Sequence, residues 1–135
     1  MTKKAIWVID DDTIYQIIIN KIIQRSKLFS TITSFKNGKE AIDALHHTVH
    51  NTKDNSDALP DIILLDIDMP IMDGWEFMEK MGLIKSKFNK NITVYIVSSS
   101  IATEDKNKSK TYSDILGYIS KPFTMNDLVL ITQKD

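Results

Sequence analysis

The chain has 135 residues, 42% hydrophobic and 26% charged, which is enough for one globular domain with a core. Seventeen basic and eighteen acidic side chains leave a net charge of −1, which argues against non-specific binding to nucleic acid or to an anionic membrane. The absence of cysteine excludes disulfides, thiol nucleophiles and thiolate metal sites. No apolar run resembles a signal peptide or reaches the length of a membrane span, so we expect a cytoplasmic protein.

The first predicted unit is a strand followed by a helix. Residues 5–9 are apolar and predict a buried strand, which three aspartates follow at once. Thr13 and Gln16 have the spacing of a capping box, and isoleucines then recur at helical intervals. We therefore expect a helix capped by Thr13.

The second unit repeats this order. Residues 31–35 are β-prone, and Asn37 with Glu40 has the spacing that caps a helix. Residues 50–59 are polar and predict an exposed loop.

The central stretch is the most informative part of the chain. Residues 62–65 are four consecutive apolar residues, typical of a strand buried on both faces. Asp66 stands where this strand stops. Pro70 helps to fix the turn that follows, and Asp73 is the expected N-cap of the next helix.

The last third contains two more predicted strands. Residues 92–97 form one and end at Ser98, and residues 117–119 form a shorter one that leads to Lys121. Residues 124–127 have capping spacing and open the last helix.

The alternation of five strands with helical segments predicts an α/β fold, with a parallel sheet covered by helices on both faces. Right-handed crossovers place the carboxyl ends of all strands at one edge of such a sheet. The polar residues that directly follow strands should therefore gather there: Asp10, Asp11, Asp66, Ser98 and Lys121.

This set of side chains suits phosphoryl chemistry. Three neighbouring carboxylates repel one another, and a hard divalent cation such as Mg²⁺ would relieve that repulsion. One carboxylate could then attack phosphorus, while Lys121 and Ser98 contact the phosphoryl oxygens. The alternative for any single aspartate is that it only caps a helix.

Four motifs together resemble the receiver domain of bacterial response regulators, the phosphoaspartate switches of two-component signalling. They are VIDD (8–11), LLDIDMPIMDG (64–74), VSS (97–99) and GYISKPF (117–123). The resemblance spans essentially the whole chain. It implies a doubly wound five-stranded sheet of order 2-1-3-4-5. It also implies a single receiver domain over residues 1–135 without an output domain. The phosphodonor would be a sensor histidine kinase or a histidine phosphotransfer protein, and the downstream protein target is unknown.

The resemblance also implies roles for the clustered residues. Asp66 would be the phosphoacceptor and Lys121 the cation that binds the phosphoryl group. Asp11 and Asp66 would hold Mg²⁺ together with the backbone carbonyl of Asp68, while Asp10 would act largely through bound water. The protein would thus catalyse only its own phosphorylation and dephosphorylation.

The implied output is a conformational switch. Ser98 would be the switch hydroxyl, and Tyr118 would turn from an exposed to a buried rotamer. The surface that changes would be the face of the fourth helix, fifth strand and fifth helix, including Ile101 and Tyr112. The family's cis peptide would lie at Lys121–Pro122.

Two departures from the family stand out. Asp68 occupies a position where the family often has Asn, which adds a carboxylate beside the site. The segment TYSDIL (111–116) is shorter and more polar than the family's usual fourth helix, so we expect this face to be loosely formed.

Two alternatives belong to other functional classes. Asp66 and Asp68 also resemble the DxD motif of haloacid-dehalogenase-type phosphohydrolases, but the acidic pair at 10–11 precedes that motif here. A degenerate receiver that serves only for docking is the second alternative, although none of the five chemical positions is missing. His46 and His50 have metal-pair spacing but are better explained as a solvated helix end.

Overall fold

The computed structural model describes residues 4–51 and 53–133. Strands and helices alternate throughout this part of the chain. The strands are β1 (Lys4–Ile9), β2 (Phe29–Phe35), β3 (Ile62–Leu65), β4 (Thr93–Ser98) and β5 (Ile115–Ser120). The helices are α1 (Thr13–Ser26), α2 (Gly38–Asn51), α3 (Gly74–Ile84), the 3₁₀ turn η1 (Lys85–Lys87), α4 (Thr103–Ser109) and α5 (Met125–Gln133).

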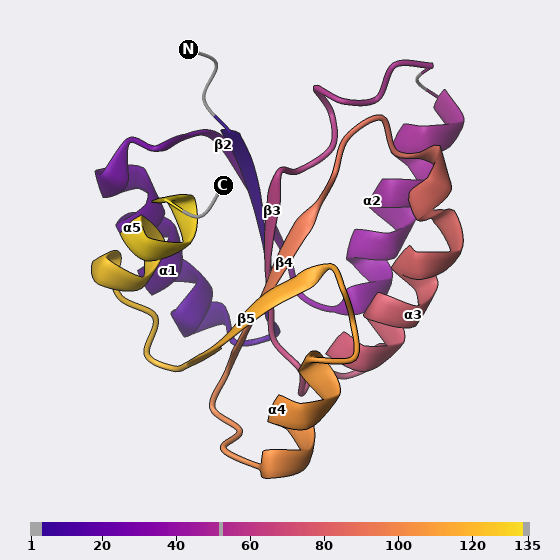
Figure 1. Ribbon diagram of the computed structural model, residues 1–135. Helices are drawn as coiled ribbons and strands as arrows, with labels where there is room; N and C mark the ends of the chain where they lie inside the picture. The colour runs from indigo at the N-terminus through magenta and orange to yellow at the C-terminus, as the bar shows by residue number, and fades with distance from the viewer. Residues whose placement is uncertain (1–3, 52, 134–135) are drawn as a thin grey trace.

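The strands form one parallel sheet of order β2-β1-β3-β4-β5, which confirms the predicted doubly wound topology. Helices α1 and α5 cover one face of this sheet, and α2 and α3 cover the other (Figure 1). The helix α4 lies beside β5, close to the edge where the strands end (Figure 1). Among the described residues, no helix is long and apolar enough to cross a membrane.

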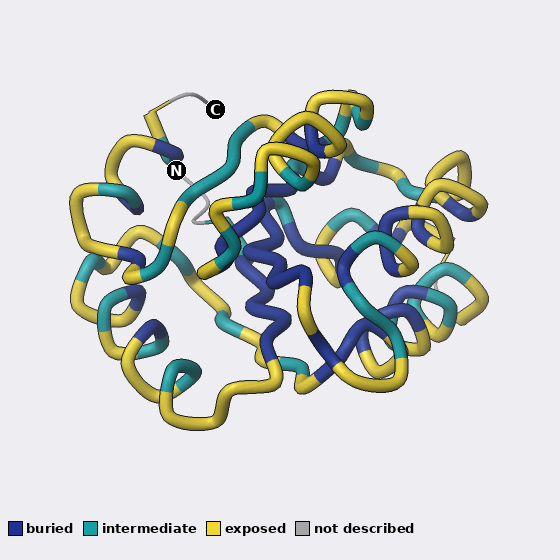
Figure 2. The backbone as a smooth tube through the Cα atoms, turned by 90° about the horizontal axis from the view of Figure 1, so that it is seen from below, coloured by how far each residue is buried: buried dark blue, intermediate teal, exposed yellow. Residues whose placement is uncertain are grey.

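The core has two layers because neighbouring strand residues point to opposite faces. All four residues of β3 are buried. Ile63 and Leu65 pack in the layer beneath α2 and α3, whereas Ile62 and Leu64 pack in the layer beneath α1 and α5. Buried backbone accordingly runs through the middle of the molecule, between helices whose outer sides are exposed (Figure 2). The prediction that β3 is buried on both faces is confirmed.

Three predicted helix caps are present. The Asn37 side chain accepts a hydrogen bond from the Glu40 N–H at 3.0 Å. At the start of α3, the side chains of Asp73 and Glu76 each accept from the other residue's N–H, which completes a capping box. Residues 124 and 127 exchange the equivalent pair of bonds before α5. These caps depend only on neighbouring residues, so spacing sufficed to predict them.

The predicted cap of α1 was wrong. Asp12, not Thr13, is the N-cap, and its carboxylate accepts from the Tyr15 N–H at 3.0 Å. The Gln16 side chain instead donates to backbone carbonyls, including that of Phe35 at 3.1 Å. Both Asp12 and Thr13 have side chains that can cap a helix. The path of the backbone after β1 therefore decides which of them is the N-cap.

Two segments differ from the prediction. Residues 103–109 form the helix α4, and the polar segment 111–116 is not part of it, because β5 already begins at Ile115. Within the loop 50–59, Asn55 is buried: it donates to the Lys87 carbonyl at 2.8 Å and accepts from the Asn89 N–H at 2.7 Å. Contacts with a distant segment therefore anchor a loop that was predicted to be exposed.

Candidate functional site: an acidic cluster with a lysine

Backbone hydrogen bonds position the residues that follow β1, β3 and β5. The N–H of Asp10 donates to the Phe35 carbonyl, and the N–H of Asp66 donates to the Ile9 carbonyl, each at 3.0 Å. The Lys121 N–H donates to the Ser98 carbonyl, also at 3.0 Å. Each residue thus extends the sheet by one bond, and its side chain is held at the carboxyl edge.

Lys121 joins two buried carboxylates. Its Nζ lies 2.8 Å from Asp10 Oδ2 and 3.5 Å from Asp66 Oδ2. Asp10 is 3% exposed and Asp66 7% exposed. The second oxygen of each carboxylate accepts a backbone N–H, from Asp12 at 2.9 Å and from Ile67 at 2.8 Å. Both carboxylates are therefore fixed in orientation.

Asp11 completes an acidic cluster. Asp10, Asp11 and Asp66 each place a carboxylate oxygen within 4.8 Å of the others, and Asp11 is exposed. Burial and the neighbouring charge of Asp10 raise the pKa of Asp66 to about 6, although Lys121 and the Ile67 N–H act in the opposite direction. Burial lowers the pKa of Lys121, but its hydrogen bond to Asp10 and the nearby charge of Asp66 outweigh burial and raise it overall. The cluster is thus electrostatically strained and suited to a hard cation with oxygen ligands.

Tyr15 is a site residue that the sequence did not indicate. Lys121 Nζ lies 4.3 Å from the centroid of the Tyr15 ring, and the Tyr15 hydroxyl accepts from the Phe123 N–H at 3.1 Å. The ring and the two carboxylates together hold the ammonium group. An aromatic residue in the first turn of a helix carries no signal for this contact, which joins residues 106 positions apart.

Gly74 is required by the close approach of α3 to the backbone after Asp66. A Cβ at this position would lie 2.6 Å from the Asp66 carbonyl oxygen and 2.9 Å from the Ile67 Cα. The Gly74 N–H donates to the Ile67 carbonyl at 2.8 Å. Any larger residue would push the helix away from the loop that carries Asp66.

The two predicted switch residues both contact Ser100. Ser98 is fully buried, and its Oγ accepts from the Ser100 N–H at 3.1 Å. The Tyr118 hydroxyl donates to the Ser100 carbonyl at 2.9 Å. The Ser100 hydroxyl in turn donates to Asp105 of α4 at 2.6 Å. A chain of contacts therefore leads from the end of β4 to α4.

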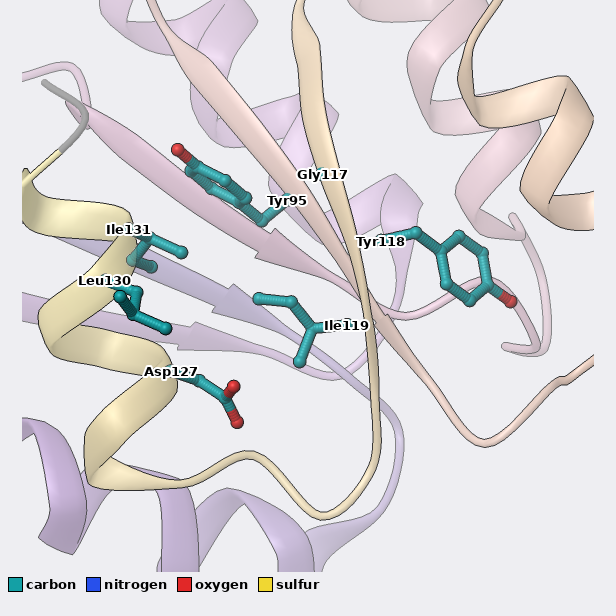
Figure 3. A pocket seen from close by; sticks show the side chains of 7 residues that line it. All are labelled: Tyr95, Gly117, Tyr118, Ile119, Asp127, Leu130 and Ile131. Carbon is teal, nitrogen blue, oxygen red and sulfur yellow. The ribbon is translucent and has the colours of Figure 1, made fainter.

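The side chains of Tyr118 in β5 and Tyr95 in β4 lie on opposite faces of the sheet. Figure 3 shows the Tyr118 ring directed away from the pocket that Tyr95 and Ile131 line between the sheet and α5. Tyr118 is half-buried and the Lys106 ammonium lies 6.0 Å from its ring centroid. Its hydroxyl donates to the Ser100 carbonyl, so the observed side chain does not point freely into solvent.

The other predicted residues lie outside the acidic cluster. Asp68 is exposed, and its carboxylate is not part of the acidic cluster. Ile101 is 79% exposed beside α4. The Tyr112 ring stacks on Trp75 at 6.0 Å between centroids, and its hydroxyl donates to Glu79 at 2.6 Å. The peptide bond Lys121–Pro122 is cis, as the resemblance implied.

Comparisons with known proteins agree on one family. A family model described as the response regulator receiver domain matches residues 6–133. A two-component response regulator from Cytophaga hutchinsonii has a similar structure, with a TM-score of 0.80 and 29% identity, over 99% of this chain and 97% of that one. The chemotaxis protein CheY4 of Vibrio cholerae has the same fold, with a TM-score of 0.76 and 20% identity, over 98% of each chain.

Curated relatives are longer proteins. The sensor histidine kinase CheAY of Helicobacter pylori is 30% identical over 128 residues, which are 93% of this chain and 14% of the relative. The DNA-binding transcriptional regulator NtrC of Escherichia coli is 25% identical over 134 residues, which are 99% of this chain and 25% of the relative. This chain thus spans a quarter or less of these relatives. The matched residues include the acidic cluster and Lys121, and the chain belongs to the response regulator receiver domain family of two-component signalling.

Proposed function

We propose that this protein is a phosphoacceptor switch in which Asp66 receives the phosphoryl group. The observation that carries the proposal is the buried Asp66 carboxylate, held beside Asp10 and within 3.5 Å of the Lys121 ammonium at the carboxyl edge of the sheet. The phosphodonor is a sensor histidine kinase or a histidine phosphotransfer protein in the cytoplasm. A downstream protein then reads the phosphorylated state.

The transfer is a displacement at phosphorus. An oxygen of the Asp66 carboxylate forms the new O–P bond while the bond from phosphorus to the donor's histidine nitrogen breaks, and the electron pair leaves with that nitrogen. Lys121 would contact a phosphoryl oxygen, and its position between Asp10 and Asp66 supports this role. It offsets negative charge as the phosphoryl group arrives.

The donor set fits Mg²⁺, since three carboxylates offer oxygens within 4.8 Å of one another. Asp11 and Asp66 would hold the ion with the Asp68 backbone carbonyl, and Asp10 would act through water. When bound, Mg²⁺ supplies positive charge that offsets both carboxylate repulsion and the charge of the phosphoryl oxygens.

The output begins at Ser98. A phosphoryl oxygen on Asp66 accepts a hydrogen bond from the Ser98 hydroxyl and draws it toward Asp66, away from the Ser100 N–H, from which Ser98 Oγ now accepts at 3.1 Å. Release of Ser100 also removes the acceptor of the Tyr118 hydroxyl. The face of α4, β5 and α5, including Ile101 and Tyr112, then differs between the two states, which is the condition for a partner to distinguish them.

Intact-mass measurement after incubation with acetyl phosphate and Mg²⁺ tests the proposal. Wild type should gain one phosphoryl group, and Asp66→Asn should gain none. Asp68→Asn is the matched control and should still be labelled, because the Asp68 carboxylate lies outside the cluster. Equal labelling of wild type and Asp66→Asn would refute the assignment of Asp66. Steady turnover of a phosphatase substrate would instead favour a phosphohydrolase.

A further inference from the structure

The strand β2 is an open edge of the sheet. Among the described residues it pairs with β1 on one side and with no strand on the other, because it is the first strand in the order β2-β1-β3-β4-β5. Its seven residues, FSTITSF, include no charged residue and no proline. Exposed edge strands usually carry such residues, which prevent pairing with another chain. The edge of β2 lacks this protection.

The register shows which backbone groups of β2 face outward. The Phe35 carbonyl accepts from Asp10, so Phe35 is directed toward β1. Successive strand residues direct their N–H and C=O groups to alternate sides, and the pairing with β1 is regular from Thr31 to Phe35. Thr31 and Thr33 therefore also face β1, whereas the backbone groups of Ile32 and Ser34 face away from it.

The sequence of β2 is a palindrome centred on Ile32. Two copies of this strand, antiparallel about a two-fold axis at Ile32, would place identical residue types opposite each other. The register shift at Ser30 limits this pairing to the centre, where Thr31 faces Thr33 and Ile32 faces itself, because Phe29 and Phe35 pack on opposite faces of the sheet.

The backbone pattern matches this pairing. Ile32 faces outward, so the central pair would exchange two N–H···O=C bonds across the axis. Thr31 and Thr33 then occupy the non-hydrogen-bonded positions, where opposing side chains are closest. Both threonine side chains are exposed, while the Ser34 hydroxyl accepts from Asn20 of α1 at 3.0 Å. The centre suggested by the palindrome is therefore also a centre that the backbone permits.

We propose that β2 is a self-association surface, and that its partner is β2 of a second copy of this chain. The two sheets would join edge to edge into one continuous sheet with the two β2 strands at its centre. The irregular register near Ser30 leaves Thr31 to Thr33 as the regular part of the contact, because Ser34 and Phe35 would face Ser30 and Phe29 of the other copy. A contact between two short strands is smaller than a standard protein interface, so we expect weak, concentration-dependent dimerisation.

Sedimentation equilibrium from micromolar to millimolar concentration tests this with two charge variants at the same positions. Thr31→Lys with Thr33→Lys places lysine opposite lysine twice across the axis and should weaken the dimer about tenfold. Thr31→Lys with Thr33→Glu places opposite charges together and should retain it. Circular dichroism and phosphorylation of Asp66 verify that both variants fold. A wild type that remains monomeric at all concentrations would overturn the proposal. This holds even if a strand of another protein binds to β2.

Cross-linking tests the register. The native chain has no cysteine, so any disulfide must come from introduced residues. A mixture of Thr31→Cys and Thr33→Cys chains should form the mixed disulfide under mild oxidation, because these positions face each other. Each variant alone should cross-link much less. Equal cross-linking in mixed and unmixed samples would contradict the register.

Discussion

At the scale of single residues, the site combines burial with unbalanced charge. Asp66 is buried beside a second carboxylate, and one lysine serves both. The pKa of Asp66 is raised to about 6 mainly because burial disfavours its charged form. The proposed phosphoacceptor is therefore held in an environment that destabilises its charged form.

This strain predicts how stability depends on pH without Mg²⁺. Because the folded pKa of about 6 exceeds the ordinary value of 3.8, the contribution of Asp66 to stability is fully present below 3.8 and is lost as pH rises through 6. Asp66→Asn should therefore be more stable than wild type at pH 7 to 8, by about 1–2 kcal/mol or a few degrees. The difference should shrink toward pH 4. Thermal melts across this range are the measurement, with Asp68→Asn as the control that should show no such gain.

A second prediction at this scale concerns Tyr15. Tyr15→Leu removes the ring that lies 4.3 Å from the Lys121 ammonium, whereas Tyr15→Phe retains it. A cation–π contact of about 1 kcal/mol corresponds to roughly a fivefold effect. Initial phosphorylation rates with acetyl phosphate should fall by this factor in Tyr15→Leu and change less in Tyr15→Phe. Equal losses in both variants would point to the hydroxyl and its bond with Phe123 instead.

At the scale of elements, α4 is a short helix held by a few side-chain contacts. Its N-cap residue, Ala102, provides no side-chain cap. The bond from Ser100 to Asp105 and the Lys108 ammonium 5.2 Å from the Trp75 ring centroid connect it to its surroundings. An element with so few contacts is easily shifted by a change at Ser98.

Hydrogen exchange of residues 100–109, with and without beryllofluoride, tests this coupling without a known partner. Wild type should show a change in protection, because the proposed activated state draws Ser98 away from the Ser100 N–H. Ser98→Ala should still bind beryllofluoride but lose the change, and Tyr118→Ala should also weaken it. Ser99→Ala is the matched control, since Ser99 is exposed. An unchanged response in Ser98→Ala would mean that the signal leaves by another route.

At the scale of the whole molecule, three strands contribute to one site, so its occupancy should affect global stability. A ligand that binds only the folded state stabilises it by mass action. Mg²⁺ should therefore raise the melting temperature of wild type. In Asp11→Asn the metal-free protein should be at least as stable as wild type, because one repelling charge is gone, but the gain with Mg²⁺ should be much smaller. Differential scanning calorimetry over a Mg²⁺ titration is the measurement. An undiminished gain in Asp11→Asn would place the ion elsewhere.

The sequence by itself determined the order of strands and helices, the buried character of β3 and the residues that meet at the carboxyl edge. These features depend on local hydrophobic patterns and on the general handedness of crossovers, and the motifs around Asp66 and Lys121 indicated the family. Most helix caps were predictable for the same reason, since a cap joins residues three positions apart.

Only the tertiary structure decided the contacts between distant residues. The packing of Tyr15 against Lys121, the burial of Asn55 against residues 87–89 and the shared contact of Ser98 and Tyr118 with Ser100 depend on how elements pack. The cap of α1 also depended on packing, because Asp12 and Thr13 were equally suitable in sequence and the path of the chain out of β1 selected Asp12. Local patterns specify elements, but the positions of side chains from different elements follow from the three-dimensional arrangement of the backbone.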